Sequence, residues 1–281
     1  MVATGFFPMP HIHRFLRLNC PSRHSPARNT TSRPHLMSST VNRVLCFLTL
    51  AATFAASPAN AQDSEKAVLA KTMQGAKTVT LFDGKTLDGW RGREDLWSVD
   101  DGAIHGQTTD EAPIKQNTFL ILDRPVKGSF ELTLQFKMIG GNSGIQYRSK
   151  VLDEEKFIVG GYQADIDATN RFAGILYEEK GRGILATRGQ QTTIWATGEK
   201  TTEQFATAEE LANSIHLGEW NDYRILVRDN HLEQFINETL MIRLVDQQPG
   251  KKADSGVIAL QLHQGPAMKV WFKNIQIREW K

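Results

Sequence analysis

Turn-forming residue pairs at short intervals are the feature of this sequence that most restricts its fold. From residue 78 onward, Asp-Gly, Gly-Gly, Asp-Asn and Asn-Glu pairs separate short segments in which apolar and polar residues alternate. Alternation of this kind puts every second side chain on one face of a β-strand, and such pairs favour tight turns between antiparallel strands. The expected strands are residues 79–82, 97–99, 103–107, 118–122, 129–139, 144–148, 161–168, 174–177, 221–228, 231–236, 239–243, 255–263 and 267–279.

One segment of the same region has the sequence of a helix. Within residues 207–213, Thr207 stands at an N-cap and Glu210 follows at the spacing of a capping box. Residues 178–205 are rich in Gly, Thr, Arg and Gln, and we expect a long loop there, which in compact domains is often functional. About a dozen strands with one short helix predict an all-β fold, an antiparallel β-sandwich or jelly roll.

The N-terminal region has the layout of a secretory signal peptide. Met37 begins a segment that contains Arg43, an apolar run at 44–56 and the small-residue triplet Ala59-Asn60-Ala61. We therefore expect a periplasmic or secreted protein, and the apolar run is too short to cross a bilayer as a helix. The expected organisation is 1–36 an over-extended start or leader, 37–61 the signal peptide, 62–75 a short leader of the mature chain and 76–281 a single domain.

Removal of the signal peptide changes the sign of the net charge. The first 61 residues contain six Arg and no acidic residue, so the mature chain keeps 27 of the 33 basic residues against 31 acidic ones and has a net charge of −4 instead of +2. This balance does not favour a nucleic-acid partner. Both cysteines, Cys20 and Cys46, precede the expected cleavage site, so the mature chain has no disulfide and no thiolate chemistry.

Two expected strands in mid-chain concentrate polar side chains on one face. By alternation, Gln146 and Arg148 share one side of the first strand, and Gln163, Asp165 and Asp167 share one side of the second. An ordinary solvent-facing strand is usually rich in Lys, Glu and Thr, whereas this combination resembles a cleft that holds a polyol. Arg148 has a second interpretation, an ion pair with Asp165 or Asp167 across neighbouring strands.

Further candidates lie on later segments. His263 follows Gln261 on the face of its strand that does not carry the leucines, so both could join the same polar face. Tyr177 and Glu178 end a strand at the expected long loop and could form a rim. Trp195 lies inside that loop, where an indole ring could stack on a sugar.

A metal site is left open by the sequence. Asp165 and Asp167 are two residues apart on a strand, which is compatible with two cooperating carboxylates or with a shared divalent cation. The mature chain has four histidines, and none stands at metal-ligand spacing from another, so a histidine-rich zinc site is not expected. These histidines are His105, His216, His231 and His263.

Eight short motifs occur in one order over nearly the whole mature chain. They are LFDGKTLDGW at 81–90, WSVDDG at 97–102, FELTLQF at 130–136, NSGIQYR at 142–148, GYQAD at 161–165, GEWN at 218–221, GVIALQLH at 256–263 and VWFKNI at 270–275. Together they resemble the exported 3-keto-disaccharide (3-keto-glycoside) hydrolase family, formerly described as a domain of unknown function. The resemblance implies a concanavalin-like β-sandwich whose concave sheet carries a carbohydrate site.

The implied reaction is cleavage of a 3-keto-glycoside. A ketone at C3 acidifies the hydrogen on C2, so a base can form an enolate, the aglycone can leave from C1, and water can then add. On this hypothesis Asp165 or His263 acts as base or acid, and Arg148, with or without a divalent metal ion, stabilises the enolate. The expected contacts to the carbohydrate substrate are Gln146, Gln163, Asp167, Tyr177, Glu178, Trp195 and Gln261.

One residue departs from the family pattern. Members of the family carry Glu after the Gly-Tyr pair, where this chain has Gln163, so a catalytic role of that Glu would pass to Asp165 or be absent. The alternative function is a non-catalytic, lectin-like carbohydrate-binding module, because a sandwich fold alone does not determine function. An ordinary glucanase is the last alternative, since the chain lacks the Glu-x-Asp-x-x-Glu strand typical of sandwich glucanases.

Overall fold

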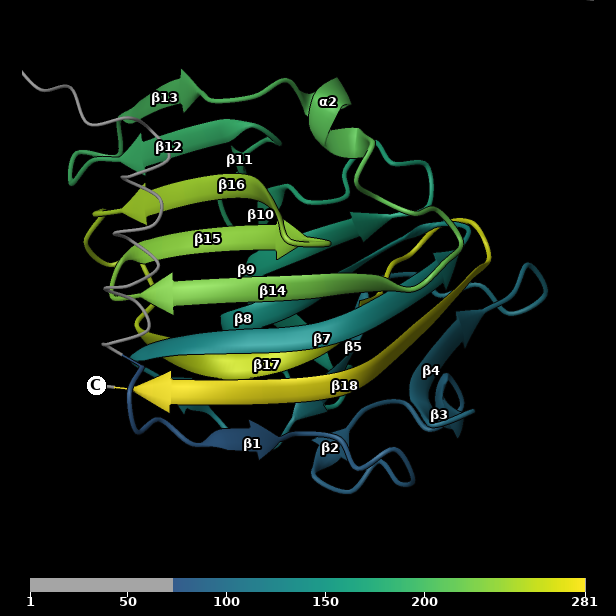
Figure 1. The fold of residues 1–281 in the computed structure, drawn as a ribbon. Coiled ribbons are helices and arrows are strands. Elements are labelled where there is room, and N and C mark those ends of the chain that lie inside the picture. Colours follow the sequence, from purple (N-terminus) through teal and green to yellow (C-terminus); the bar gives the residue numbers. More distant parts are fainter. Residues whose placement is uncertain (1–72, 281) are drawn as a thin grey trace, which may run out of the picture. The chain divides into compact units, whose positions relative to one another are not determined.

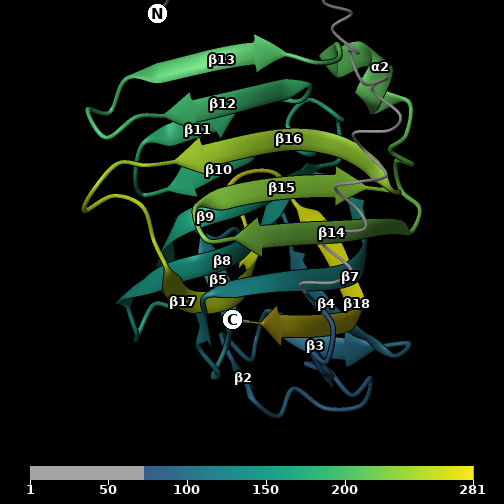
Figure 2. The ribbon, with the colours of Figure 1, turned by 60° about the vertical axis from the view of Figure 1, so that its left-hand side comes forward.

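The computed structural model describes residues 73–280 and consists of two β-sheets stacked as layers (Figures 1 and 2). The larger sheet has ten strands. In order across it lie β13 (Lys200–Gln204), β12 (Gln190–Ile194), β16 (Thr239–Asp246), β15 (His231–Ile236), β14 (Asn221–Arg228), β7 (Ser129–Ile139), β18 (Met268–Trp280), β4 (Ala103–Thr108) and β3 (Trp97–Asp100), with β1 (Thr78–Thr80) paired to β18.

The smaller sheet has eight strands. In order across it lie β11 (Gly183–Ala186), β10 (Leu176–Glu179), β9 (Ile158–Asp167), β8 (Asn142–Asp153), β17 (Ser255–Leu262), β5 (Thr118–Leu122) and β2 (Trp90–Arg91), with β6 (Val126–Lys127) paired to β17. Neighbouring strands are antiparallel in both sheets except for β12 and β16, which run parallel.

The expected all-β architecture with one short helix is confirmed over the described residues. They form a concanavalin-like, jelly-roll sandwich, and their helix is α2 (Ala208–Ala212). The hydroxyl of Thr207 accepts a hydrogen bond from the amide of Glu210, whose carboxylate accepts one from the amide of Thr207. This reciprocal capping box explains why so short a helix begins at that residue.

The core lies between the two sheets and follows the strand alternation. In β7, Phe130, Leu132, Leu134 and Phe136 are buried in it, while the residues that alternate with them, 131, 133 and 135, are partly exposed. In the smaller sheet, Tyr162 and Ala164 point into the same core. Strands β8 and β9 are buried on both faces, so the side chains opposite the core are covered as well. The outer face of the smaller sheet is therefore largely covered, and beside its polar side chains it carries a small apolar cluster of Phe119, Ile121, Val159 and Ala259.

The prediction of a long loop at 178–205 is wrong. This stretch contains the end of β10 and the strands β11, β12 and β13. Strand β13 lies at the end of the larger sheet and is exposed along its whole length. An exposed edge strand has no face that must be apolar, so its sequence, Lys-Thr-Thr-Glu-Gln, lacks the alternation that reveals an inner strand.

Candidate functional site

A pocket of about 440 Å³ opens on the outer face of the smaller sheet. This volume lies within the range of about 300–1,000 Å³ that is typical of small-molecule sites. Its walls come from the beginning of β8, the end of β9, β10 and the chain segments beside β5 and β17. The lining residues are Asn117, Asn142, Gln163, Asp165, Phe172, Ile175, Tyr177, Glu179, Lys180, Ile184, His263 and Gln264.

Strand alternation and register bring the polar side chains of this pocket together. Ala164 of β9 and Leu176 of β10 point into the core and pair with each other, so their neighbours Gln163 and Tyr177 point outward as the next pair. Asp165 follows Gln163 at the next outward position of β9. Gln163 and Asp165, two of the three residues of the polar face predicted for β9, thus line the pocket.

Asp165 is the most perturbed acid of the pocket. Its side chain is only 6% exposed, and its Oδ1 accepts a hydrogen bond of 2.6 Å from Gln163 Nε2. Asn142 Nδ2 lies 3.3 Å from Oδ2. Burial raises the pKa of Asp165 to about 7, the charges of Asp167 and Glu179 add to the rise, and the two amide donors oppose it. A carboxyl group with this pKa can both take up and release a proton near neutral pH.

Three glutamines form a buried cluster beside Asp165. Gln163 Oε1 accepts hydrogen bonds from Gln146 Nε2 at 2.7 Å and from Gln261 Nε2 at 3.0 Å. Ser149 Oγ in turn donates to Gln146 Oε1 at 2.5 Å. Because two donors hold the carbonyl oxygen of Gln163, its amide nitrogen is turned toward Asp165. The cluster is at most 2% exposed, and Gln163 is the member that lines the pocket.

The far wall of the pocket carries a second carboxylate, Glu179, which the sequence analysis did not select. Its Oε1 accepts a hydrogen bond from Asn117 Nδ2 at 3.1 Å and lies 3.7 Å from Lys180 Nζ. Burial and the charges of Glu179 and Asp165 raise the pKa of Tyr177, which lies between them. The signal was present in the sequence, because Glu179 is two positions after Tyr177 and must share its face.

Asp167 lies outside the pocket and shapes one of its walls. Its Oδ2 accepts hydrogen bonds from the amides of Arg171 at 2.7 Å and Phe172 at 2.9 Å. Burial would raise the pKa of Asp167, but these backbone amides and Thr169 outweigh it and lower the pKa. Arg188 holds the same loop through the carbonyl oxygens of residues 170 and 173. Asp167 therefore builds the loop that places Phe172 against the pocket.

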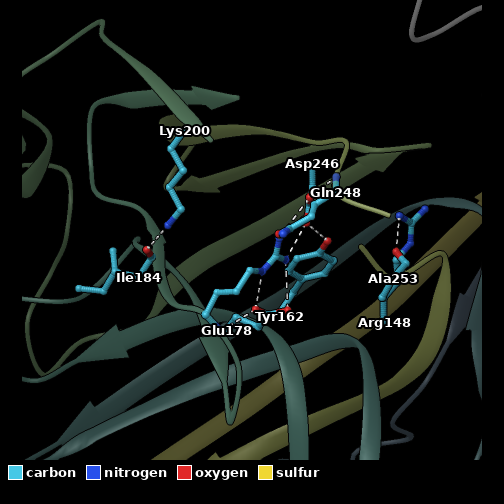
Figure 3. Close-up of polar contacts among 9 residues, drawn as sticks. Arg148, Tyr162, Glu178, Ile184, Lys200, Asp246, Gln248 and Ala253 are labelled. Carbon is cyan, nitrogen blue, oxygen red and sulfur yellow. Dashed lines mark hydrogen bonds and ion pairs between the residues drawn. The ribbon is translucent and has the colours of Figure 1, made fainter. Parts of the chain in front are cut away.

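The prediction that Arg148 shares the face of Gln146 is wrong. A β-bulge follows Tyr147, where Arg148 adopts a φ of +48°, so both Tyr147 and Arg148 turn away from the polar face. Arg148 donates to the carbonyl oxygens of Asp229, Ala253 and Gly128 at 2.6, 3.1 and 2.7 Å (Figure 3 shows the bond to Ala253). The alternative ion pair with Asp165 or Asp167 is also absent among the described residues.

Gly256 of β17 permits this bulge. Its φ is +154°, and a β-carbon there would overlap the backbone of Arg148 and Ser149. A side chain at this position would therefore push the two strands apart.

Glu178 and Trp195 also lie away from the pocket. Glu178 points to the inner side of β10, where its Oε2 accepts a hydrogen bond of 2.6 Å from Arg182 Nε beside Tyr162 and Asp246 (Figure 3). Trp195 follows β12 at the edge of the larger sheet, is 43% exposed, and donates to Thr201 Oγ1. Of the residues selected from sequence, the structure brings Gln163, Asp165, Tyr177 and His263 around the pocket, with Gln146 and Gln261 beside it.

The pocket does not have the donor set of a metal centre. Over residues 73–280, no three or more His, Cys, Asp or Glu side chains lie close enough together to hold an ion. Asp167 is one of the two carboxylates considered for a shared cation. Both of its oxygens already accept hydrogen bonds from the loop that follows β9. We derive no step of the chemistry through a metal ion.

The expected signal peptide at 37–61 lies outside the described residues. Within the described part of the chain, no helix has the length and apolar character needed to span a bilayer.

The chain is similar to several known proteins. Residues 77–278 match the family described as the 3-keto-alpha-glucoside-1,2-lyase-like domain. A 3-keto-disaccharide hydrolase of Bacteroides thetaiotaomicron is 40% identical over 77 residues, which span 25% of this chain and 26% of that relative. Among solved structures, a candidate glycosyl hydrolase from Parabacteroides distasonis is 20% identical over 72% of this chain and 99% of its own, with a TM-score of 0.48. The carbohydrate-binding module CBM66 from Bacillus subtilis is 13% identical over 68% and 96%, with a TM-score of 0.45.

The match to the family model covers nearly all of the described residues and confirms the resemblance predicted from the eight motifs. This chain belongs to the 3-keto-alpha-glucoside-1,2-lyase-like domain family.

Proposed function

We propose that the protein cleaves the glycosidic bond of 3-keto sugars by elimination, with Asp165 as the base that removes the proton from C2. The observation that carries this proposal is the buried Asp165 carboxyl group in the pocket, whose pKa is raised to about 7. The hydrogen on C2 of a 3-keto sugar is acidic because its removal gives an enolate, so a base of this strength suits the step. The family and the partial relative support the same class of substrate.

The chemistry balances without an external oxidant or reductant. Asp165 takes the C2 proton, the electron pair forms the enolate, and the C1–O bond then breaks as the aglycone leaves with a proton. The product is an unsaturated 3-keto sugar. Addition of water across its C1–C2 double bond, with the proton returned to C2 and hydroxide to C1, completes a net hydrolysis.

Other residues of the pocket can supply the remaining roles. The enolate oxygen needs a donor, and Lys180 and Asn142 both present N–H groups to the pocket. We assign the protonation of the leaving oxygen to His263, whose imidazole ring lines the pocket. Arg148, which the sequence analysis assigned to the enolate, is held instead by three backbone carbonyl groups.

Turnover of an oxidised substrate tests the proposal. The protein is incubated with 4-nitrophenyl 3-keto-glucoside, and release of nitrophenol is followed. Asp165→Asn should abolish release while the protein still binds the sugar, because the amide keeps the shape of the carboxylate but cannot take a proton. Asp222→Asn, on the larger sheet, is the matched control. Full activity of Asp165→Asn would refute the assignment of the base.

A second candidate function is a non-catalytic carbohydrate-binding module. It is favoured by the neutral polar groups of Asn117, Asn142, Gln163 and Tyr177, which suit the hydroxyl groups of a sugar. Saturable binding of a glycan without release of aglycone would support this candidate. Release from an unoxidised glucoside would instead indicate an ordinary glucanase.

We also propose that the protein is exported to the periplasm or the exterior, on the basis of the signal-peptide pattern at 37–61. Expression of the full sequence in a bacterium and N-terminal sequencing of the product test this point. A mature protein that begins at Gln62 is expected, and an uncleaved cytoplasmic product would contradict it.

A further inference from the structure

A second pocket, of about 200 Å³, shares Glu179 and Lys180 with the first. It lies where β8 and β9 approach the turn after β10 and the segment that contains Gly250 and Ala253. Five basic side chains line it against two acidic ones. The basic residues are Arg148, Lys150, Lys180, Arg182 and Lys251, and the acidic residues are Glu178 and Glu179.

The acidic side chains of this second pocket are already engaged. Arg182 forms ion pairs of 2.6 Å with Glu178 and 2.7 Å with Asp246, so this guanidinium is neutralised by its own partners. Glu179 accepts from Asn117 and lies beside Lys180. Neither acid is therefore available to balance the other cations of the pocket.

Arg148 is a buried cation without a carboxylate partner among the described residues. It is 2% exposed, and its terminal nitrogens donate to three backbone carbonyl groups, one of which is Ala253 in Figure 3. Its Nε has no hydrogen-bond partner. Carbonyl groups satisfy these N–H groups, and the negative charges of Asp254 and Asp229 offset part of the guanidinium charge: burial lowers the pKa of Arg148, and these carboxylates act to raise it. With Lys150 and Lys251, the residues that line the pocket still carry more positive than negative charge.

The shape of the second pocket permits close approach to the main chain. Four glycines line it, Gly160, Gly161, Gly181 and Gly250, and at Gly250 a β-carbon would meet open space, so the main chain there is open to a ligand. Lys150 and Lys251 line the pocket and are exposed, so their ammonium groups can contact a ligand that enters from solvent. The charge and the shape together suit a small, compact anion.

We propose that this second pocket binds a carboxylate or phosphate group, either as a free anion or as a substituent on a sugar that occupies the adjoining pocket. Lys150 and Lys251 contact the anion directly, and the buried positive charge of Arg148 adds to the attraction. Binding of the anion does not depend on the reaction proposed above, and it is measured without turnover.

Calorimetric titration of the full chain at low ionic strength tests the proposal, with inorganic phosphate, glucuronate and, as the neutral control, glucose. We expect saturable binding of phosphate that weakens as salt is added. The double variant Lys150→Ala/Lys251→Ala should weaken phosphate binding about tenfold, because it removes two exposed charge contacts that each contribute modestly. Lys127→Ala/Lys269→Ala, which removes two exposed lysines outside the pocket, should leave it unchanged.

The outcomes separate the two sources of the anion. Glucuronate that binds much more tightly than both phosphate and glucose indicates an anion carried on a sugar, whereas equal affinity for phosphate and glucuronate indicates a free anion. No saturable binding by the unmodified protein, or equal affinity in both double variants, would overturn the proposal. Asp165→Asn should retain phosphate binding even if it removes turnover, so failure of one proposal is distinguishable from failure of the other.

Discussion

Gln163 donates a hydrogen bond of 2.6 Å from Nε2 to Oδ1 of Asp165, and its own carbonyl oxygen is held by Gln146 and Gln261. The glutamine therefore cannot rotate its amide without losing two hydrogen bonds. Oδ1 of Asp165 is fixed as an acceptor, which leaves Oδ2 as the oxygen that gains or loses the proton. Asn142, the neighbour of Oδ2, can present either its N–H or its carbonyl oxygen.

Catalysis should depend on pH through Asp165. A base must be deprotonated to accept the C2 proton, and the pKa of Asp165 is raised to about 7 by burial. The rate of nitrophenol release at low substrate should therefore rise from pH 5.5 to 8.5 with a midpoint of about 7. A profile that is flat over this range, or that falls with a midpoint near 7, would exclude Asp165 as the base.

Stability should depend on pH in the opposite direction. The pKa of Asp165 is about 7 in the folded protein and about 3.8 for an aspartate in an unfolded chain, so between these pH values the folded state binds the extra proton. The contribution of this carboxyl group to stability is therefore present at low pH. It is lost as the pH rises through 7, which lowers the free energy of unfolding by at most about 4 kcal/mol. Asp165→Asn should remove the loss and be more stable than the unmodified protein at pH 8, with a smaller difference at pH 5. Denaturant unfolding of both proteins at the two pH values measures this difference in stability. A difference of the same size at both pH values would contradict the prediction.

Gln163→Glu should raise the pKa of Asp165 further. The substitution puts a second carboxylate in hydrogen-bond contact with Oδ1, where like charges disfavour ionisation and the donor is lost. We expect the rising limb of the pH–rate profile to move to higher pH by about one unit or more. Gln135→Glu, on the larger sheet, is the control for an added charge elsewhere. If the rising limb of the pH–rate profile does not shift in Gln163→Glu, the hydrogen bond from Gln163 does not control the pKa of Asp165.

Much of the fold followed from alternation because inner strands must keep one face apolar, as in Phe130, Leu132 and Phe136. The same rule found the outward face of Gln163 and Asp165. It failed at Arg148, because a bulge reverses the face and depends on Gly256 of a distant strand. Such a contact between remote segments leaves no local periodicity to detect.

The remaining differences have a similar cause. Strand β13 was missed because an exposed edge needs no apolar pattern. Glu179 was not selected because the expected strand ended at Tyr177, whereas β10 continues to Glu179. The engagement of Asp167 by backbone amides depends on the conformation of residues 168–172, which the sequence alone does not give.

Asp167→Ala should loosen the wall of the first pocket. The carboxylate accepts from the amides of Thr169, Arg171 and Phe172, so its removal leaves donors of a partly buried loop without partners. We expect a loss of about 1–3 kcal/mol in the free energy of unfolding and a weaker affinity for the sugar. Because the pKa of Asp167 is lowered in the folded protein, the contribution of this carboxylate to stability is present at neutral pH and is lost on acidification below about pH 4. An Asp167→Ala protein with unchanged unfolding and unchanged KM would contradict this role.

Arg182→Met should be far more damaging than loss of an exposed cation. Asp246 is 0% exposed, and its carboxylate accepts from Arg182 and Tyr162. Burial would raise the pKa of Asp246, but these donors lower it, so its ion pair contributes stability at neutral pH that is lost on acidification. Without Arg182 this buried charge has no cation partner among residues 73–280, at a cost of about 3–5 kcal/mol. Arg93→Ala, which breaks only the exposed pair with Asp95, should cost no more than about 1 kcal/mol. Denaturant unfolding at pH 7 compares the two variants. Equal losses would mean that the Arg182 cluster is too well solvated to anchor β9, β10 and β16 to one another.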